Sequence, residues 1–217
     1  MKRHELLNEI IKRNGYKKYL EIGIDDPNNC FNHIKAEKKI GVDPYNDKLG
    51  THQWNANNVE AMKEAIDGEW YEMKSDEFFK KKRNKFDLIF IDGLHKEKQV
   101  DKDIKNSLSR LNAGGIVVMH DTMPRMEDVQ TNTPIAGSPW MGDCYRSFWK
   151  LRMQRDDLEL ATLDIDTGFS FIKEGSNVKY SAPNFKGHMS FMYFKLHRNK
   201  IMNTISLNQF YDTWCKK

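Results

Sequence analysis

The sequence contains no hydrophobic run that approaches the roughly 18 apolar residues that a membrane-spanning helix requires. Its three cysteines, Cys30, Cys144 and Cys215, lie far apart. An odd number of distant cysteines does not indicate a disulfide framework or a C-x-x-C metal site. The first residues, Met1 to Glu5, carry charges where a secretion signal would have an apolar core. We therefore expect a protein of the reducing cytoplasm with no membrane partner.

Neither sign of charge dominates the chain. The sequence has 35 basic and 31 acidic side chains, a formal net charge of +4, and the two signs are interspersed. The basic run Lys80-Lys81-Lys82-Arg83 is interpreted as a solvated helix end, with a phosphate-binding patch as the alternative. This distribution is not typical of an obligate nucleic-acid binder, so we expect no nucleic-acid partner.

Two motifs that would define other enzyme classes are missing. A nicotinamide or flavin site needs the glycine-rich sequence G-x-G-x-x-G after its first strand, so that the backbone can approach a pyrophosphate. Residues 23–28 read Gly-Ile-Asp-Asp-Pro-Asn instead, with one glycine and two acids. A methyltransferase that acts on a flipped base would have an Asn/Asp-Pro-Pro-aromatic motif after the fourth strand, where this chain has Asp-Gly-Leu-His at 92–95. Both classes are therefore disfavoured.

Strand-like and helix-like segments alternate along the first 120 residues, after an amphipathic helix at 1–14 that ends at Gly15. Such alternation predicts a Rossmann-like, doubly wound α/β fold with a mostly parallel sheet. Two later strands flank the turn at 164–168 and predict an antiparallel edge, which makes seven strands in all. We expect strands at 18–23, 39–43, 70–74, 86–91, 115–120, 158–164 and 168–173, and further helices near 29–36, 56–66, 76–83, 96–111 and 143–155.

Two segments depart from this alternation. Residues 122–142 carry three prolines and two glycines and have few regular signals, which is typical of a lid or substrate loop, with a plain connection as the alternative. Residues 176–217 are rich in aromatic side chains. We interpret residues 1–175 as one domain and residues 176–217 as a C-terminal helical extension that packs on the core or on a partner subunit. The extension is thus a candidate surface for a homo-oligomer.

Each of the first, second, fourth and fifth strands ends in charged or polar residues. The corresponding tips carry Glu21, Asp43, Asp92 and the pair His120-Asp121. Because carboxyl ends of parallel strands meet at one edge of the sheet, these side chains should surround one crevice. An acid after the second strand can accept hydrogen bonds from both hydroxyls of a ribose. The acids in the first loop would repel a pyrophosphate but tolerate a cation, which favours S-adenosylmethionine as the cofactor.

At this point the chain resembles the class I S-adenosylmethionine-dependent methyltransferases. More narrowly, it is similar to the small-molecule O-methyltransferase-like group that is associated with sugar and glycan modification. The resemblance runs from about residue 16 to about residue 173 and depends on the order of its motifs. These are Tyr19-Leu20-Glu21-Ile22-Gly23, Val42-Asp43-Pro44, Ser75-Asp76-Glu77-Phe78-Phe79, Phe90-Ile91-Asp92-Gly93-Leu94-His95, and Leu111-Asn112-Ala113-Gly114-Gly115 with His120-Asp121.

The resemblance implies cofactor-binding roles for Glu21, Gly23, Asp43, Ser75, Asp76 and Asp92. Glu21 and Gly23 would shape the loop at the methionine end, and Asp43 would hold the ribose diol. Ser75 and Asp76 would line the adenine edge, although either could instead be only the N-cap of the next helix. The group has a second glycine near position 25, where this chain has two aspartates. Aspartate can adopt a left-handed conformation at modest cost.

The same resemblance implies that Asp92 faces the reacting centre and that His95, His120 and Asp121 line the acceptor side. We expect His95 to be the general base that activates an acceptor hydroxyl, with His120 as the second candidate. A metal-assisted version would place Mg²⁺ on Asp92, His120 and Asp121, but magnesium favours an oxygen ligand where His120 stands. A His could also be a buried structural residue.

The acceptor is expected to be a small polar molecule such as a sugar or glycan precursor. Trp140, Tyr145 and Trp149 could stack on it, but aromatic residues at helical spacing are more often part of a core. Two other functions stay open at this point: a non-catalytic protein that binds a nucleoside cofactor, and a nicotinamide-dependent oxidoreductase.

Overall fold

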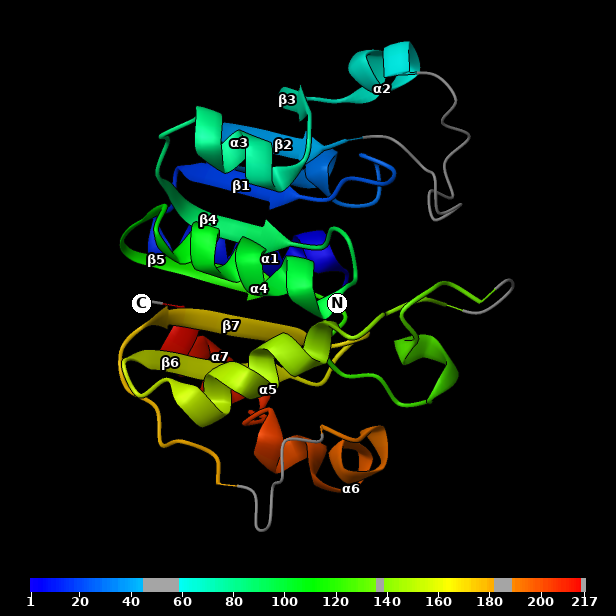
Figure 1. Ribbon diagram of the computed structural model, residues 1–217. Coiled ribbons are helices and arrows are strands. Elements are labelled where there is room, and N and C mark those ends of the chain that lie inside the picture. Colours follow the sequence, from blue (N-terminus) through cyan, green and yellow to red (C-terminus); the bar gives the residue numbers. More distant parts are fainter. Residues whose placement is uncertain (45–58, 136–138, 182–188, 216–217) are drawn as a thin grey trace.

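A computed structural model of the chain describes residues 1–44, 59–135, 139–181 and 189–215. The described residues form a seven-stranded sheet in the order β3-β2-β1-β4-β5-β7-β6 (Figure 1). Neighbouring strands from β3 to β5 pair in parallel, whereas β7 runs antiparallel to both β5 and the edge strand β6. The strands are β1 (Lys18–Ile22), β2 (Lys38–Asp43), β3 (Glu69–Glu72), β4 (Phe86–Ile91), β5 (Leu111–Met119), β6 (Leu158–Leu163) and β7 (Phe169–Glu174).

Helices cover both faces of this sheet, which confirms the predicted doubly wound α/β fold with antiparallel pairing at one edge. In Figure 1, α3, α4 and α5 lie in front of the sheet, and α1 and α7 lie behind it. None of the helices in the described ranges is long and apolar enough to cross a membrane. The helices are α1 (Arg3–Asn14), α2 (Val59–Ala65), α3 (Ser75–Lys81), α4 (Glu97–Leu108), α5 (Cys144–Gln154), α6 (Phe191–Ile201) and α7 (Leu207–Trp214), with short 3-10 helices η1 (Phe31–His33) and η2 (Asp128–Gln130).

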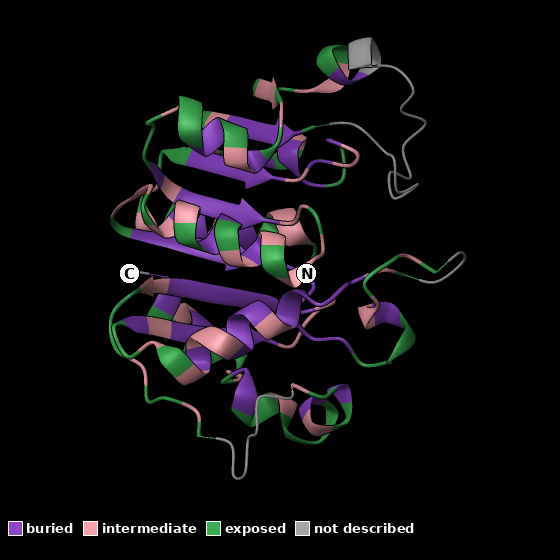
Figure 2. Cartoon of the chain, in the orientation of Figure 1, coloured by how far each residue is buried: buried purple, intermediate pink, exposed green. Residues whose placement is uncertain are grey.

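Strand β4 shows why the sheet is buried on both faces. Its sequence, Phe-Asp-Leu-Ile-Phe-Ile, is apolar at five of six positions, as a central parallel strand requires. Because side chains alternate along a strand, Leu88 and Phe90 join the hydrophobic cluster under α1, while Ile89 and Ile91 join the cluster under α3 and α4. The buried purple strands of Figure 2 lie between these two layers.

Helix α1 forms because its apolar residues recur at helical spacing and face the sheet. Leu6, Leu7, Ile10 and Ile11 are all buried, and polar residues occupy the remaining positions. Gly15 ends the helix in the left-handed conformation, with φ of 66°. The packing of this stripe fixes the start of α1 beside the carboxyl ends of the strands (Figure 1).

Two predicted elements differ from the structure. The helix expected at 29–36 is only the short 3-10 helix η1, because Asn32 uses its side-chain amide to bind the Ala65 carbonyl and the Asp67 N–H, both at 2.8 Å. Strand β5 begins at Leu111, four residues before the predicted start at 115. Gly114 and Gly115 lie inside β5, where the register with β4 shifts.

The aromatic residues of the C-terminal segment pack on the rest of the chain. Tyr193 of α6 stacks on Trp149 at a ring-centroid distance of 5.9 Å, and Phe194 lies 4.3 Å from Tyr145. Trp214 of α7 lies 5.4 Å from Phe171 of β7. These residues therefore pack on the core of their own chain, which was the first of the two alternatives for the C-terminal segment. Since Tyr145 and Trp149 are fully buried in this cluster, their suggested stacking on an acceptor is wrong.

Candidate active site

The carboxyl edge of the sheet gathers the acidic strand tips. Glu21 is the fourth residue of β1, Asp43 ends β2, Asp92 follows β4, and His120 and Asp121 follow β5. β1 pairs in parallel with both β2 and β4, and β4 pairs with β5, so these tips lie on adjacent strands. The edge therefore carries four acids and one imidazole, as the sequence predicts.

The turn after β1 brings two backbone segments into contact at Gly23. The Gly23 N–H donates to the Val42 carbonyl, and the Asp92 N–H donates to the Ile22 carbonyl, both at 2.9 Å. Gly23 has φ of +91°, and a Cβ at this position would lie 2.3 Å from the Asp92 carbonyl oxygen. Only glycine can fill this position without displacing the turn that carries Asp92.

Asp43 is buried and held in a fixed orientation at the end of β2. Its Oδ2 accepts a hydrogen bond from the Ile24 N–H at 2.8 Å. In the loop between them, Asp25 and Asp26 both have negative φ, so the left-handed conformation suggested for these aspartates is wrong. Asp26 instead closes a turn by accepting from the Asn28 N–H at 2.9 Å. The ribose-binding role of Asp43 stays a prediction, and residues 45–58 lie outside the described part of the chain.

Glu21 lies below the surface of this edge. Its Oε2 accepts a hydrogen bond of 2.5 Å from the Tyr19 hydroxyl. Burial raises the pKa of Glu21 to about 8. Its role at the methionine end of the cofactor stays a prediction.

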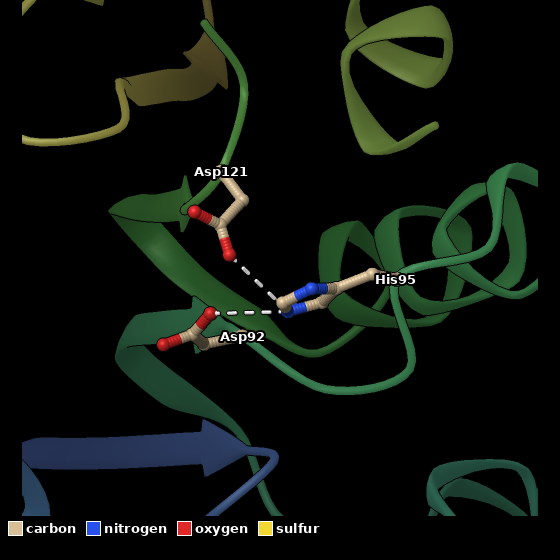
Figure 3. A group of neighbouring side chains, drawn as sticks. All are labelled: Asp92, His95 and Asp121. Atoms are coloured by element: carbon tan, nitrogen blue, oxygen red, sulfur yellow. Dashed lines mark ion pairs between the residues drawn. The ribbon is translucent and has the colours of Figure 1, made fainter. Parts of the chain in front are cut away.

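Three side chains converge above β4 and β5 (Figure 3). Nε2 of His95 lies 3.5 Å from Oδ1 of Asp92 and 3.4 Å from Oδ2 of Asp121. One possible ligand atom from each residue lies within 4.8 Å of the others, which is close enough for all three to bind one metal ion. We call Asp92, His95 and Asp121 the catalytic cluster.

His95 is oriented by the segment that precedes α5. Its Nδ1 lies 2.9 Å from the Trp140 carbonyl oxygen, which can only accept, so Nδ1 carries a proton and Nε2 faces the two carboxylates. Burial disfavours the charged imidazolium, but the hydrogen bond to Asp92 and the charge of Asp121 outweigh it, so the pKa of His95 is raised. The loop at 122–142 thus contributes a contact to the cluster, and its suggested lid function stays a prediction.

His120 lies deeper than His95 and uses both ring nitrogens within the protein. Nδ1 lies 3.3 Å from Oδ1 of Asp92, and Nε2 lies 3.1 Å from the Thr167 hydroxyl and 3.3 Å from Oδ2 of Asp166. Burial opposes its charge, yet Asp92 and Asp121 raise the pKa of His120 well above the usual value. His95 is the more accessible imidazole, with 17% of its side chain exposed against 2% for His120.

Ser75 and Asp76 form the first turn of α3 and contact α4. The Ser75 hydroxyl donates to Oδ1 of Asp103 at 2.6 Å, and Asp76 accepts from Lys102 at 3.1 Å. The N-cap of α3 is Lys74, so the suggestion that either residue is the cap itself is wrong. Burial raises the pKa of Asp103 to about 6. A role for Ser75 and Asp76 at the adenine edge stays a prediction.

Sequence reasoning missed three contributors to the site. Arg3 donates from Nη1 to Oδ2 of Asp92 at 2.6 Å, although the two residues are 89 positions apart. Asp166, in the β6–β7 turn, has φ of 56° and contacts His120. The third contributor is a backbone carbonyl, that of Trp140. Only Asp166 had a signal in the sequence. The acidic turn Asp-Ile-Asp-Thr-Gly at 164–168 follows β6, which ends at the same carboxyl edge as β4 and β5.

Similarity to known proteins agrees with this fold and edge. Residues 12–122, just over half of the chain, match the family described as a methyltransferase domain. With the sheet order and the acidic strand tips, the match defines a class I methyltransferase that depends on S-adenosylmethionine. The chain belongs to this methyltransferase-domain family. None of the curated proteins matches the chain.

Solved structures with a similar fold include three methyltransferases. The PaMTH1 methyltransferase of Podospora anserina, bound to S-adenosylhomocysteine, is 17% identical with a TM-score of 0.56, and the alignment covers 80% of this chain and 78% of that one. An O-methyltransferase of Bacillus cereus with the same ligand is 15% identical, with a TM-score of 0.56 and 80% coverage of both chains. TomG of Streptomyces achromogenes, an O-methyltransferase bound to S-adenosylmethionine, is 13% identical with a TM-score of 0.53 and 79% coverage of both.

Proposed function

We propose that this methyltransferase methylates a hydroxyl group of a small polar acceptor, such as a sugar or glycan precursor. The observation that carries the proposal is the catalytic cluster, in which His95 Nε2 faces two carboxylates at adjacent strand tips. An alcohol is a poor nucleophile until its proton is removed, and an imidazole in this position is suited to remove it. Two of the fold neighbours are named O-methyltransferases, which agrees with a hydroxyl acceptor.

The acids of the carboxyl edge and the packing of its turns support the binding of S-adenosylmethionine there. Because Gly23 has no side chain, the turns after β1 and β4 lie in contact, which holds Asp92 at this edge. Asp43 would accept from the ribose hydroxyls, Ser75 and Asp76 would line the adenine, and Glu21 and Asp92 would face the amino-acid end. When bound, the cofactor supplies a methyl group on a positively charged sulfur, and the acids of this edge stabilise a cation.

In this proposal His95 is the general base. The Trp140 carbonyl holds the Nδ1 proton, so Nε2 is the atom that accepts the proton of the acceptor hydroxyl. Asp92 and Asp121 stabilise the imidazolium that results. His120 is the second candidate, but its side chain is only 2% exposed, against 17% for His95, which opposes that role.

The test is a methyl-transfer assay with methyl-labelled S-adenosylmethionine and a panel of sugars, sugar nucleotides, catechols and primary amines. Mass spectrometry would locate the added methyl group. We expect an oxygen-linked methyl on a sugar-containing acceptor. Transfer to an amine nitrogen with no hydroxyl product would contradict O-methylation, and transfer to catechols alone would contradict the sugar class. If the protein bound S-adenosylmethionine but transferred no methyl group to any acceptor, the result would contradict this proposal and support a non-catalytic cofactor-binding protein.

Replacing Asp43 with asparagine should weaken the binding of S-adenosylmethionine by roughly ten- to a hundred-fold, because a charge-assisted hydrogen bond contributes about 1.5–3 kcal/mol. Asparagine keeps an oxygen for the Ile24 N–H, so the fold should be retained. Isothermal titration calorimetry measures the change. The matched control is Glu37→Gln, which removes an exposed acid paired with Lys17 and should leave the affinity within about twofold. Equal affinity in the Asp43 variant and the wild type would remove Asp43 from the cofactor site.

The catalytic cluster also fits a divalent cation, which is the second candidate mechanism. The fitting set is Asp92, His95 and Asp121, with His95 in place of the predicted ligand His120. These residues would hold the ion, which would polarise an acceptor hydroxyl. An imidazole ligand suits manganese or zinc better than magnesium. The observation that favours the metal mechanism is that one ligand atom from each of these three residues lies within 4.8 Å of the others.

Exhaustive chelation separates the two mechanisms. If His95 is the base, dialysis against EDTA and then assay in metal-free buffer should leave turnover within about twofold of the untreated enzyme. The control is the same enzyme after addition of Mg²⁺, Mn²⁺ or Zn²⁺. Turnover that disappears on chelation and returns with one of these ions would assign the cluster to metal binding.

A further inference from the structure

Arg3 is a basic side chain placed among the acids of the catalytic edge. It is the first residue of α1, and its Nη1 donates to Oδ2 of Asp92 at 2.6 Å. A third of its side chain, 33%, stays exposed. A guanidinium carries five N–H donors, and within the described part of the chain Asp92 is the one acceptor that Arg3 binds. Arg3 therefore has donors left for an anionic ligand.

The surroundings of Arg3 indicate which part of the cofactor it would meet. Asp92, which Arg3 binds, is one of the two acids assigned to the amino-acid end, and the other, Glu21, lies on the neighbouring strand β1. Burial raises the pKa of Glu21, and the charge of Arg3 opposes that rise. An amino-acid end is a zwitterion, with an ammonium group and a carboxylate on one carbon. Acids alone can bind only the ammonium half.

We propose that Arg3 binds the carboxylate of the methyl donor's amino-acid end, an inference that rests on the proposed placement of the cofactor. The planar fork of arginine can bind Asp92 through Nη1 and a second carboxylate through its remaining N–H groups. Asp92 fixes the guanidinium in place and at the same time faces the ammonium group. Helix α1 thus contributes a residue to cofactor recognition as well as covering one face of the sheet.

A cycle of two proteins and two ligands tests this contact. The proteins are the wild type and Arg3→Gln, and the ligands are S-adenosylmethionine and decarboxylated S-adenosylmethionine, which lacks only the carboxylate. Both ligands keep the ammonium and the sulfonium. If the variant also disturbs Asp92, the binding free energy of both ligands changes equally, and this effect cancels in the cycle. Isothermal titration calorimetry gives the four dissociation constants without requiring turnover.

We expect Arg3→Gln to weaken the binding of S-adenosylmethionine roughly ten- to a hundred-fold. The affinity for the decarboxylated ligand should change by less than about threefold. Arg3→Lys keeps the charge but loses the planar fork, so its affinity for S-adenosylmethionine should lie between those of the wild type and Arg3→Gln. The control is Arg13→Gln. Arg13 lies on the same helix, is exposed and pairs with Glu9, so this variant should leave both affinities unchanged. Thermal unfolding of each variant verifies that α1 remains packed.

Three results would overturn the proposal. The Arg3→Gln protein could keep the wild-type preference for S-adenosylmethionine over the decarboxylated ligand. The wild-type protein could bind both ligands equally. Both affinities could stay constant in the variant while the KM for the acceptor rises, which would assign Arg3 to an anionic acceptor. If the wild-type protein bound neither ligand, the cofactor placement itself would fail, and this outcome is distinct from the other three.

Discussion

Replacing His95 with alanine should lower kcat by about 10²–10⁴-fold, the usual contribution of a positioned general base. The dissociation constant of S-adenosylmethionine should stay within about threefold, because His95 belongs to the acceptor side of the edge. The loss has a direct physical origin: Nε2 is the imidazole nitrogen that faces Asp92 and Asp121 while the Trp140 carbonyl fixes the other nitrogen. Steady-state kinetics and calorimetry on the same preparation measure the two quantities.

The control for this variant is His197→Ala, which removes an exposed histidine of α6 and should leave kcat within about twofold. A kcat of the His95 variant within tenfold of the wild type would contradict the base mechanism. A fall in cofactor affinity equal to the fall in kcat would instead assign His95 to binding.

The wild-type rate should also depend on pH in a defined direction. His95 must be neutral to accept a proton, and its pKa is raised above 6.5 because Asp92 and Asp121 outweigh the effect of burial. The rate limited by this base should therefore rise with pH, and the rise should lie above pH 6.5. A pH–rate profile that is flat between pH 6 and 9 would contradict this assignment.

Replacing Gly23 with alanine should destabilise the protein by about 2–5 kcal/mol and abolish measurable cofactor binding. A side chain at positive φ costs roughly 1–2 kcal/mol, and forcing an extra methyl into a filled space costs about 1–3 kcal/mol more. The added Cβ would lie 2.3 Å from the Asp92 carbonyl oxygen, so the β1 turn and the β4 turn must move apart. Urea unfolding and calorimetry with S-adenosylmethionine measure the two effects.

Gly15→Ala is a matched control for this prediction. Gly15 also has positive φ, +66°, but a Cβ there would have no neighbour within 4 Å. Its variant should lose only about 1–2 kcal/mol and keep full cofactor affinity. If the two variants were equally stable, the close contact between the β1 and β4 turns would have no energetic consequence, and the account of Gly23 would be wrong.

Much of the fold could be predicted because local patterns and long-range packing agree. The apolar run of β4 and the amphipathic stripe of α1 specify buried elements without reference to the rest of the chain. The acids at the strand tips could be placed on one edge because parallel strands end together. The short turn at Asn32 was mispredicted because its side chain binds residues more than 30 positions away, which no local pattern contains.

The site was harder to predict than the edge that carries it. Arg3 reaches Asp92 only because α1 packs across the sheet, and Asp166 reaches His120 only because β7 lies next to β5. The distinction between His95 and His120 depends on how many partners each ring has, which sequence spacing does not determine. The positions of Tyr145 and Trp149, in contrast, could be expected from the sequence, because aromatic residues at helical spacing are usually buried, and these two pack against α6.

A crystal structure with bound S-adenosylhomocysteine would decide whether the cofactor lies across the carboxyl edge of this sheet. We predict ribose hydroxyls within hydrogen-bond distance of the Asp43 carboxylate, the amino-acid end beside Gly23 and Arg3, and the sulfur facing Asp92, His95 and Asp121. A ligand bound elsewhere, or a ribose that makes no contact with Asp43, would contradict the account.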